Sequence, residues 1–581
     1  MHRLLLPIDA LVTLFVLTAV WLGVSSSYDP ALSYPVQLGV IVSGGVYLAV
    51  AHGLVTWRIA YVFGRLLLLA STAAAAVFIL QFAYQDYVEV PAIIERIGSL
   101  TTLLPNLNLA WQHPNAEAAF MIGTIPLGVV LIVTSRRWLW RSLWIVCTLV
   151  CLYALLLTFS RGAMVGLGAT LCIAGLVLSK KLIVRVGAVA LLIGGIAAVA
   201  LTSAGSAWVL SRWDLYRNSL YVAGDYVLTG IGLGDTFPLV YSRYGLLIQV
   251  PQLTYPHNLL LSVWMGQGLP GLVIFLLLII TFYLFVRRVL RSQPRRLFHA
   301  GWLGVTAILI HGLFDSRQYI EVLWLMGHLF ALIGLTAACG RLALWQPEED
   351  VPKVFRRYFP NRLVAATAIA AVIAVILFNQ ELLAAWHTNQ GALAETHAEL
   401  NPTLRAADRE AGFRQAQSLY QQALAINPVW PNANRRMGNL YVKAEDFAQA
   451  VPLLEQAYRA EPANIATIKG LALAYMWNGQ LEGAAEGFNL LPDPARMAEE
   501  LLTWGYWRTN EQDQPLLGAY AYETSQLMLP GNVSIPVWQA AADAYRAAGE
   551  LERARQWYER ILAEAPDNTA ARQALAELDD A

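Results

Sequence analysis

The sequence predicts an all-α protein, in which a polytopic bundle of about eleven transmembrane helices is followed by an extracytoplasmic α-helical repeat solenoid. Hydrophobic residues make up 57% of the 581-residue chain and charged residues only 14%; soluble domains typically contain about 25% charged residues. The apolar residues gather into stretches long enough to cross a bilayer. After about residue 385 the chain becomes Ala-rich and charged and carries a helical repeat.

Charge and cysteine content exclude several classes of protein. The formal net charge is zero, which argues against a broadly basic nucleic-acid-binding protein. The four cysteines lie in apolar runs, without a CxxC pair or a neighbouring histidine. They are therefore interpreted as small buried hydrophobic residues. We predict no disulfide framework, no metal site and no cofactor.

Eleven apolar stretches are candidate spans, and the first is interpreted as a retained helix and not a cleaved signal peptide. They cover residues 8–24, 36–56, 59–82, 116–134, 139–158, 162–179, 182–202, 257–286, 299–314, 319–340 and 362–379. The basic residues between them alternate in number, as the positive-inside rule requires. The predicted cytoplasmic loops carry Arg58, Arg136, Arg137, Arg141, Lys180, Lys181, Arg185, Arg287, Arg288, Arg291, Arg295, Arg296, Lys353, Arg356 and Arg357. An odd number of spans then puts the C-terminal part outside the cytoplasm.

The last third of the chain has the spacing of tetratricopeptide repeats. Pro428 and Pro462 are 34 residues apart, and small and aromatic residues recur between and after them at fixed offsets. The clearest positions are Gly438, Tyr441, Ala450, Ala457, Leu471, Tyr475, Ala484, Phe488, Trp538, Tyr545, Ala554 and Tyr558. Segment 492–533 is irregular. We predict two domains: a transmembrane domain over 1–384, with a long extracytoplasmic loop at 203–256, and a repeat domain over 385–581.

Three charged or titratable residues on the outer side are candidates for function. Arg161 lies in a very short outside loop; an interfacial snorkelling arginine is the alternative. Arg212 and Tyr216 share one helical face of loop 203–256, as do Trp213 and Arg217. An arginine fork suits a phosphate, although Arg212 has a salt bridge with Asp214 or Asp225 as its alternative. His257, at the entrance of a span, has the chemistry of a general base, or it is simply a cap.

The Gly-rich stretch 230–234 is predicted to form a tight turn. It contains a G-x-G but no helix start of the dinucleotide-binding type. Gly232 and Gly234 would instead let the backbone approach a ligand or a neighbouring helix. Arg243 follows in the same loop.

Three motifs in residues 115–340 resemble the O-antigen ligase and polymerase superfamily of bacterial envelope glycan enzymes. The first is T-x-S-R-G-A at 158–163. The second is Arg212, then Tyr216, then G-I-G-L-G-x-x-F at 230–237, with Tyr216 where a tryptophan is usual. The third is the ligase motif, in which His257 and Asn258 are followed by nine residues, Gly268, two residues and Gly271.

The resemblance implies transfer of a glycan from a polyprenyl-diphosphate carrier, of the undecaprenyl type, to a hydroxyl acceptor. The acceptor would be a lipid A core sugar, a protein or a wall glycan, at the outer face of the cytoplasmic membrane. His257 would be the base and Arg161 and Arg212 would bind the diphosphate, without metal and with inversion. Asn258, Arg217, Arg243, Tyr216, Gly232 and Gly234 would support them.

Other functions remain open at the level of sequence. A polymerase that extends the glycan would share the fold. A transporter with a scaffold domain is one alternative. Paired carboxylates within the spans would favour transport, and the spans have almost none. A pure assembly scaffold needs only an anchor, whereas this chain has eleven candidate spans.

Overall fold

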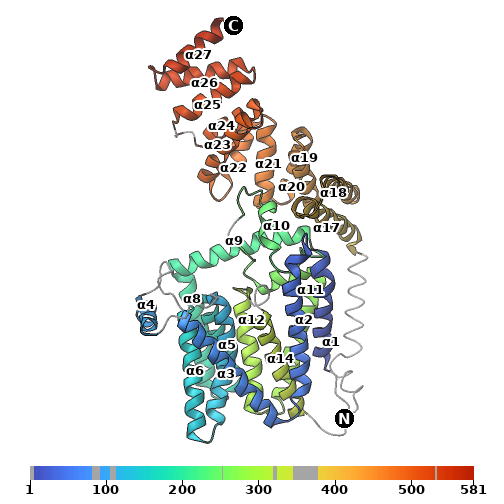
Figure 1. Ribbon diagram of the computed structural model, residues 1–581, viewed down its shortest axis with the longest axis vertical. Coiled ribbons are helices and arrows are strands. Elements are labelled where there is room, and N and C mark those ends of the chain that lie inside the picture. The colour runs from blue at the N-terminus through green and yellow to red at the C-terminus, as the bar shows by residue number, and fades with distance from the viewer. Residues whose placement is uncertain are drawn as a thin grey trace. The chain divides into compact units, whose positions relative to one another are not determined.

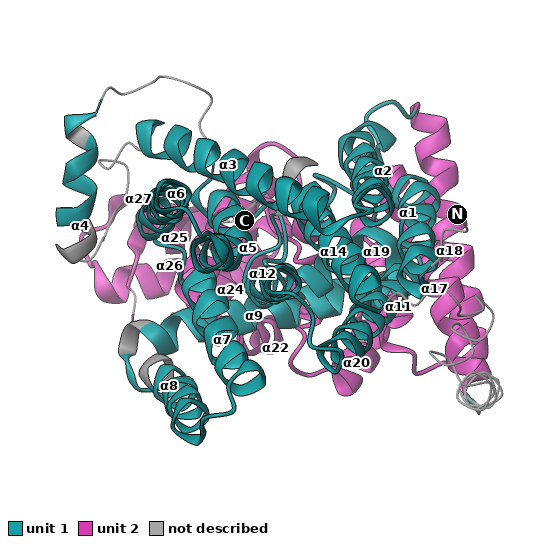
Figure 2. Ribbon diagram, turned by 90° about the horizontal axis from the view of Figure 1, so that it is seen from below, with its two compact units in different colours: residues 1–240, 250–377, 399–404 teal, residues 241–249, 378–398, 405–581 magenta. Residues whose placement is uncertain are grey.

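The computed structural model describes residues 6–81, 92–104, 113–250, 253–317, 323–344, 377–529, 531 and 533–580. These residues form α-helices and one short 3-10 helix, with no strand among them. Two compact units divide the chain (Figure 2). Unit 1 contains Met1–Val240, Val250–Leu377 and Glu399–Leu404, and unit 2 contains Tyr241–Gln249, Phe378–Ala398 and Arg405–Ala581.

Unit 1 is a bundle of long apolar helices (Figure 1). Its helices are α1 (Pro7–Ser25), α2 (Pro30–Gly53), α3 (Trp57–Gln81), α4 (Ala92–Gly98), η2 (Ser99–Leu103), α5 (Pro114–Thr134), α6 (Trp138–Leu157), α7 (Arg161–Leu178), α8 (Leu182–Leu201), α9 (Ser203–Asp225), α10 (Phe237–Tyr244), α11 (Leu259–Leu290), α12 (Arg296–Gly312) and α14 (Leu323–Leu344). The last residues of α10 belong to unit 2.

Eight of these helices are long and apolar enough to cross a membrane: α1, α2, α3, α5, α6, α7, α11 and α14. Two more predicted spans, 182–202 and 299–314, correspond to α8 and α12. The described apolar part of α8, Leu182–Ala197, is shorter than a full span, and α12 has 17 residues. The eleventh predicted span, 362–379, lies almost entirely outside the described residues, so the predicted total of eleven stays a prediction.

The interior of the bundle is built around α14, which packs along α2 and also contacts α12. Helices α5 and α12 also pack against each other, as do α1 and α11. Large apolar side chains remain exposed on α6 and α8, for instance Trp138 and Leu191. An apolar exterior of this kind suits a surface in contact with lipid.

Helix α11 begins and bends at residues that the chain specifies locally. Asn258 is its N-cap, because the Asn258 side-chain oxygen accepts hydrogen bonds from the backbone N–H groups of Leu260 (3.0 Å) and Leu261 (3.1 Å). Gly268 has φ 65° and kinks the helix. A Cβ atom at Gly268 would collide with the carbonyl oxygen of Leu228, so the turn after α9 can approach α11 only at a glycine.

Unit 2 contains the repeats. Its helices are α17 (Asn379–Leu400), α18 (Ala406–Ile426), α19 (Pro431–Lys443), α20 (Phe447–Ala460), α21 (Ile465–Trp477), α22 (Leu481–Asn489), α23 (Pro494–Asn510), α24 (Pro515–Met528), α25 (Ile535–Ala547), α26 (Leu551–Glu564) and α27 (Thr569–Asp580). Successive helices pack in pairs, such as α19 with α20 and α25 with α26. The irregular segment 492–533 also contains a packed pair, α23 and α24.

The predicted small residues are the points where paired helices approach. A Cβ at Gly438 of α19 would lie 2.6 Å from the Leu454 side chain of α20. Ala450 and Ala457 are fully buried. The repeat prediction is therefore confirmed, including the reason for its spacing.

Candidate active site

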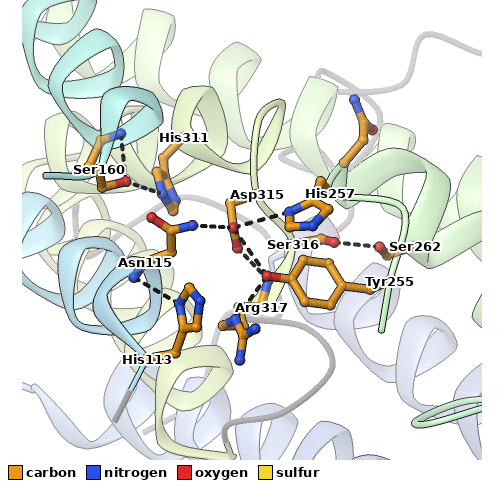
Figure 3. A network of polar contacts seen from close by, with 12 residues as sticks. His113, Asn115, Ser160, Tyr255, His257, Ser262, His311, Asp315, Ser316 and Arg317 are labelled. Atoms are coloured by element: carbon orange, nitrogen blue, oxygen red, sulfur yellow. Dashed lines mark hydrogen bonds and ion pairs between the residues drawn. The ribbon is translucent and has the colours of Figure 1, made fainter. Parts of the chain in front are cut away.

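A network of polar side chains in unit 1 brings together four segments that are far apart in the sequence (Figure 3). His113 and Asn115 lie at the start of α5, and Ser160 is the N-cap of α7. Tyr255 and His257 precede α11. Asp315, Ser316 and Arg317 follow α12. The network therefore forms only when the bundle is assembled.

Asp315 lies at the centre of the network and is only 2% exposed. One carboxylate oxygen, Oδ2, accepts hydrogen bonds from the Asn115 amide (2.8 Å) and the Tyr255 hydroxyl (3.2 Å). The other, Oδ1, accepts one from the backbone N–H of Arg317 (2.9 Å). Burial by itself would raise the pKa of Asp315, but its contact with His257, the electrostatic interaction with His311 and His257, and the Arg317 N–H outweigh burial and hold that pKa below its usual value. Asp315 is therefore a carboxylate.

His257 faces this carboxylate with its Nδ1 atom, which lies 3.5 Å from Asp315 Oδ2. The carboxylate favours the tautomer that carries its proton on Nδ1, so Nε2 is left as the proton acceptor. Burial lowers the pKa of His257; the Arg212 and Arg317 charges act in the same direction, and Asp315 opposes them. The imidazole is therefore neutral near pH 7, which is the form that a general base requires.

The backbone at His257 is held in an unusual conformation. His257 has φ 52°, a value that non-glycine residues seldom adopt. The Tyr216 hydroxyl of α9 donates toward the carbonyl oxygens of His257 (3.1 Å) and Leu313 (2.7 Å). The Asn258 amide donates to the same Leu313 carbonyl (3.1 Å). Tyr216 and Asn258, both predicted as supporting residues, thus connect α9, the start of α11 and the end of α12.

Arg212 of α9 lies within electrostatic reach of the histidine. Its charge adds to the effect of burial in lowering the pKa of His257, and it partly opposes burial at Tyr216, whose pKa is raised to about 12. Its Nε atom is buried and has no hydrogen-bond partner among the described residues. The predicted salt bridge to Asp214 is instead made by Arg217 (3.1 Å). The Nε atom of Arg217 is likewise buried without a hydrogen-bond partner, so the two arginines differ in the ion pair with Asp214, which only Arg217 makes.

Arg161 is the first residue of α7 and is exposed. Its guanidinium lies 5.8 Å from the centroid of the Phe159 ring. The preceding residue, Ser160, caps α7 and lies 3.5 Å from Nε2 of His311. His311 lies one helical turn before Asp315, so Ser160 belongs to the polar network. Arg161 directly follows Ser160 in the sequence and is therefore adjacent to this network.

Three predicted residues, Gly232, Gly234 and Arg243, are not part of the polar network described above. Gly232 (φ 97°) and Gly234 (φ 75°) approach the start of α2 so closely that a side chain at either would collide with Ser27 or Leu32. Close approach to a neighbouring helix is one of the two roles predicted for these glycines; the role toward a ligand stays a prediction. Arg243 lies in α10, in the residues that belong to unit 2.

Sequence reasoning missed Asp315, Tyr255 and Arg317 as members of the site. Arg317 Nε donates to the Tyr255 hydroxyl (2.8 Å), and its guanidinium lies 5.0 Å from the Tyr255 ring centroid. An acidic residue at the outer end of an apolar helix was the available signal for Asp315. Among the described residues, no three or more His, Cys, Asp or Glu side chains gather as metal ligands.

Comparisons with known proteins match three segments of the chain. Residues 146–276, which include Arg161, Arg212 and His257, match the family model described as O-antigen ligase. Residues 441–502 and 535–578 match models of the tetratricopeptide repeat. No curated protein matches the chain. The chain is thus a multi-pass membrane protein that is similar to O-antigen ligases over residues 146–276 and carries C-terminal tetratricopeptide repeats.

Proposed function

We propose that this protein transfers a glycan from an undecaprenyl-type diphosphate carrier to a hydroxyl acceptor, at the outer face of the cytoplasmic membrane. The observation that carries the proposal is the pairing of His257 with the buried carboxylate of Asp315, within reach of the charge of Arg212. The similarity of residues 146–276 to O-antigen ligases supports glycan transfer in envelope biosynthesis.

His257 is the general base in this proposal. Nε2 of His257 takes the proton of the acceptor hydroxyl while Asp315 stabilises the resulting imidazolium. The acceptor oxygen forms a bond to the anomeric carbon, and the bond from that carbon to the diphosphate oxygen breaks. A direct displacement of this kind inverts the anomeric configuration.

Arg212 and Arg161 bind the diphosphate leaving group. Negative charge develops on the leaving oxygen as the glycosidic bond breaks, and fixed guanidinium groups stabilise that charge most effectively where water is partly excluded. Arg212 is favoured over Arg217 for this role because Arg217 is engaged in an ion pair with Asp214, while the Nε of Arg212 has no hydrogen-bond partner among the described residues. We propose that these cations act without a metal ion.

The acceptor class distinguishes a ligase from a polymerase. A ligase would use a lipid A core sugar, a protein or a wall glycan, whereas a polymerase would use another carrier-linked glycan. The ligase motif from His257 to Gly271 favours the ligase. The repeats over 385–581 are proposed to bind the acceptor or a protein partner on the extracytoplasmic side, because stacked repeats form extended binding surfaces.

An assay of the purified protein tests the function. His257→Ala should abolish transfer from carrier-linked glycan while carrier binding persists, because the base is lost and the arginines remain. Arg212→Lys should also fail, since lysine keeps the charge but not the planar fork. Trp213→Ala, an exposed neighbour of Arg212 (60% exposed), is the matched control. Full activity of His257→Ala, or activity only with added divalent metal, would contradict the mechanism.

A further inference from the structure

The repeat unit contains a short piece of the extracytoplasmic loop. Segment Tyr241–Gln249 belongs to unit 2, together with the repeats and apart from the rest of the loop (Figure 2). In the sequence this segment follows the Gly-rich turn and ends eight residues before His257. The segment that joins the repeat unit is therefore close in sequence to the proposed base, His257.

Tyr244 is the anchor of the segment and is 6% exposed. Its hydroxyl exchanges hydrogen bonds with Asn464, donating to Oδ1 (3.1 Å) or accepting from Nδ2 (2.8 Å). The Arg435 guanidinium lies 4.3 Å from the centroid of the Tyr244 ring. Arg435 is 2% exposed, and a cation–π contact is strongest when it is removed from water.

The partners of Tyr244 belong to the repeat helices, and Asn464 is also held by contacts within the repeats. Asn464 caps α21 by accepting from the backbone N–H groups of Ala466 and Thr467, and its amide also donates to Glu461 (2.8 Å). Arg435 lies in α19, which begins the preceding repeat. Leu246 adds an apolar contact, since it packs against the buried cluster that includes Ile468 and Leu501. Partners that the repeats already hold in place lower the cost of ordering on binding.

We propose that the repeats bind the protein's own segment Tyr241–Gln249 as an internal ligand, and that Tyr244, Arg435 and Asn464 are positioning residues for His257. Chain continuity transmits the effect: when the segment is held, the short connection to Tyr255 and His257 has fewer conformations available. The strained backbone of His257 (φ 52°) is the kind of feature that persists only when its surroundings fix it. The effect on catalysis rests on the proposed glycan transfer, whereas the contact itself does not.

The test uses the full chain and two independent measurements. Amide hydrogen exchange of residues 241–249 reports whether the segment is held, without any need for activity. Steady-state transfer separates kcat from the KM for the donor. The variants are Tyr244→Ala, Arg435→Ala and the double variant. Trp213→Ala and Arg405→Ala are matched controls, because the Arg405 side chain is 84% exposed and paired only within its own turn.

We expect Tyr244→Ala to accelerate exchange over 241–249 and to lower kcat about 10- to 100-fold, as small displacements of catalytic groups do, with donor KM changed less than about twofold. The double variant should be no slower than the slower single variant, because the two substitutions remove the same contact between Tyr244 and Arg435. Tyr244→Ala lies in the loop, so it remains informative if Arg435→Ala destabilises the repeats.

Three results would overturn the inference. Unchanged exchange in Tyr244→Ala would show that the repeats do not hold the segment. Faster exchange with unchanged kcat would reject the positioning role, and losses that multiply in the double variant would show two separate roles. If the unaltered protein transfers no glycan, the proposed function fails, and the exchange measurement still decides whether the segment is bound.

Discussion

At the scale of single residues, the chemistry depends on which nitrogen of His257 faces Asp315. Nδ1 faces the carboxylate at 3.5 Å, so the other nitrogen is free to accept a proton. The same carboxylate also accepts hydrogen bonds from Asn115, from Tyr255 and from the backbone N–H of Arg317. A carboxylate held by four groups orients the imidazole with little freedom, which is what a base needs for efficient proton transfer.

Asp315→Asn is predicted to lower kcat about 100-fold or more, because an amide no longer fixes the tautomer of His257. The pH profile gives the second signature. Asp315 raises the pKa of His257 against burial, so its removal lowers that pKa further. The acid limb of kcat, where His257 becomes protonated, should therefore move to lower pH. Asp214→Asn, which affects only the pair with Arg217, should leave the limb in place. A limb that moves to higher pH would contradict the assignment.

The sequence could predict the residues of the site only where a motif or a costly charge marked them. His257, Arg212 and Tyr216 were predicted from motifs of this kind; the structure joins Tyr216 to the carbonyl of His257 by a hydrogen bond, and the roles of all three stay predictions. Asp315 was missed because its role depends on contacts between distant segments: the end of α12 lies against the start of α11, and Asn115 of α5 donates a hydrogen bond to the Asp315 carboxylate. Such contacts between distant segments leave no local pattern in the sequence. A repeat, in contrast, places small residues such as Gly438 and Ala457 at fixed offsets, and these offsets can be recognised from the sequence alone.

At the scale of elements, the start of α11 combines a helix cap with a hydrogen bond to the end of α12, next to the proposed base. Asn258 satisfies two backbone N–H groups of α11 and also reaches Leu313. Asn258→Ala should lose about 1 kcal/mol of stability with the cap, together with activity. Asn258→Asp keeps the acceptor but loses the amide donor, so its thermal midpoint should stay near that of the unaltered protein while kcat falls. Equal thermal midpoints for all three proteins would argue against the cap.

The kink in α11 at Gly268 explains why the ligase motif contains a glycine so far from the histidine. Gly268 has φ 65°, and a Cβ there would collide with the Leu228 carbonyl. We predict that Gly268→Ala destabilises the fold by about 2–4 kcal/mol, from backbone strain and overpacking together. Gly187→Ala in α8 is the control, since a Cβ there meets no atom within 4 Å. Thermal unfolding in detergent compares them, and similar midpoints would refute the packing role.

At the scale of the whole molecule, the proposal needs the repeats and the catalytic histidine on the same side of the membrane. The start of α7, loop 203–256 and the start of α11 are all predicted to be outside, because basic residues concentrate in the alternate loops. The repeats follow on the outside only if 362–379 is a span. The contact of Tyr244 with Arg435 and Asn464 supports the same arrangement, since a loop segment can bind the repeats only where both are on one side.

A reporter that is active only in the cytoplasm tests this topology. Fused after Ala581, it should be silent, because an odd number of spans carries the C-terminus out. Fusions after Ser135 and after Ser179, next to basic loops, should be active and serve as controls for expression. An active fusion after Ala581 would mean that the repeats are cytoplasmic. They could then bind neither an extracytoplasmic acceptor nor segment Tyr241–Gln249, so one measurement would reject both roles proposed for them.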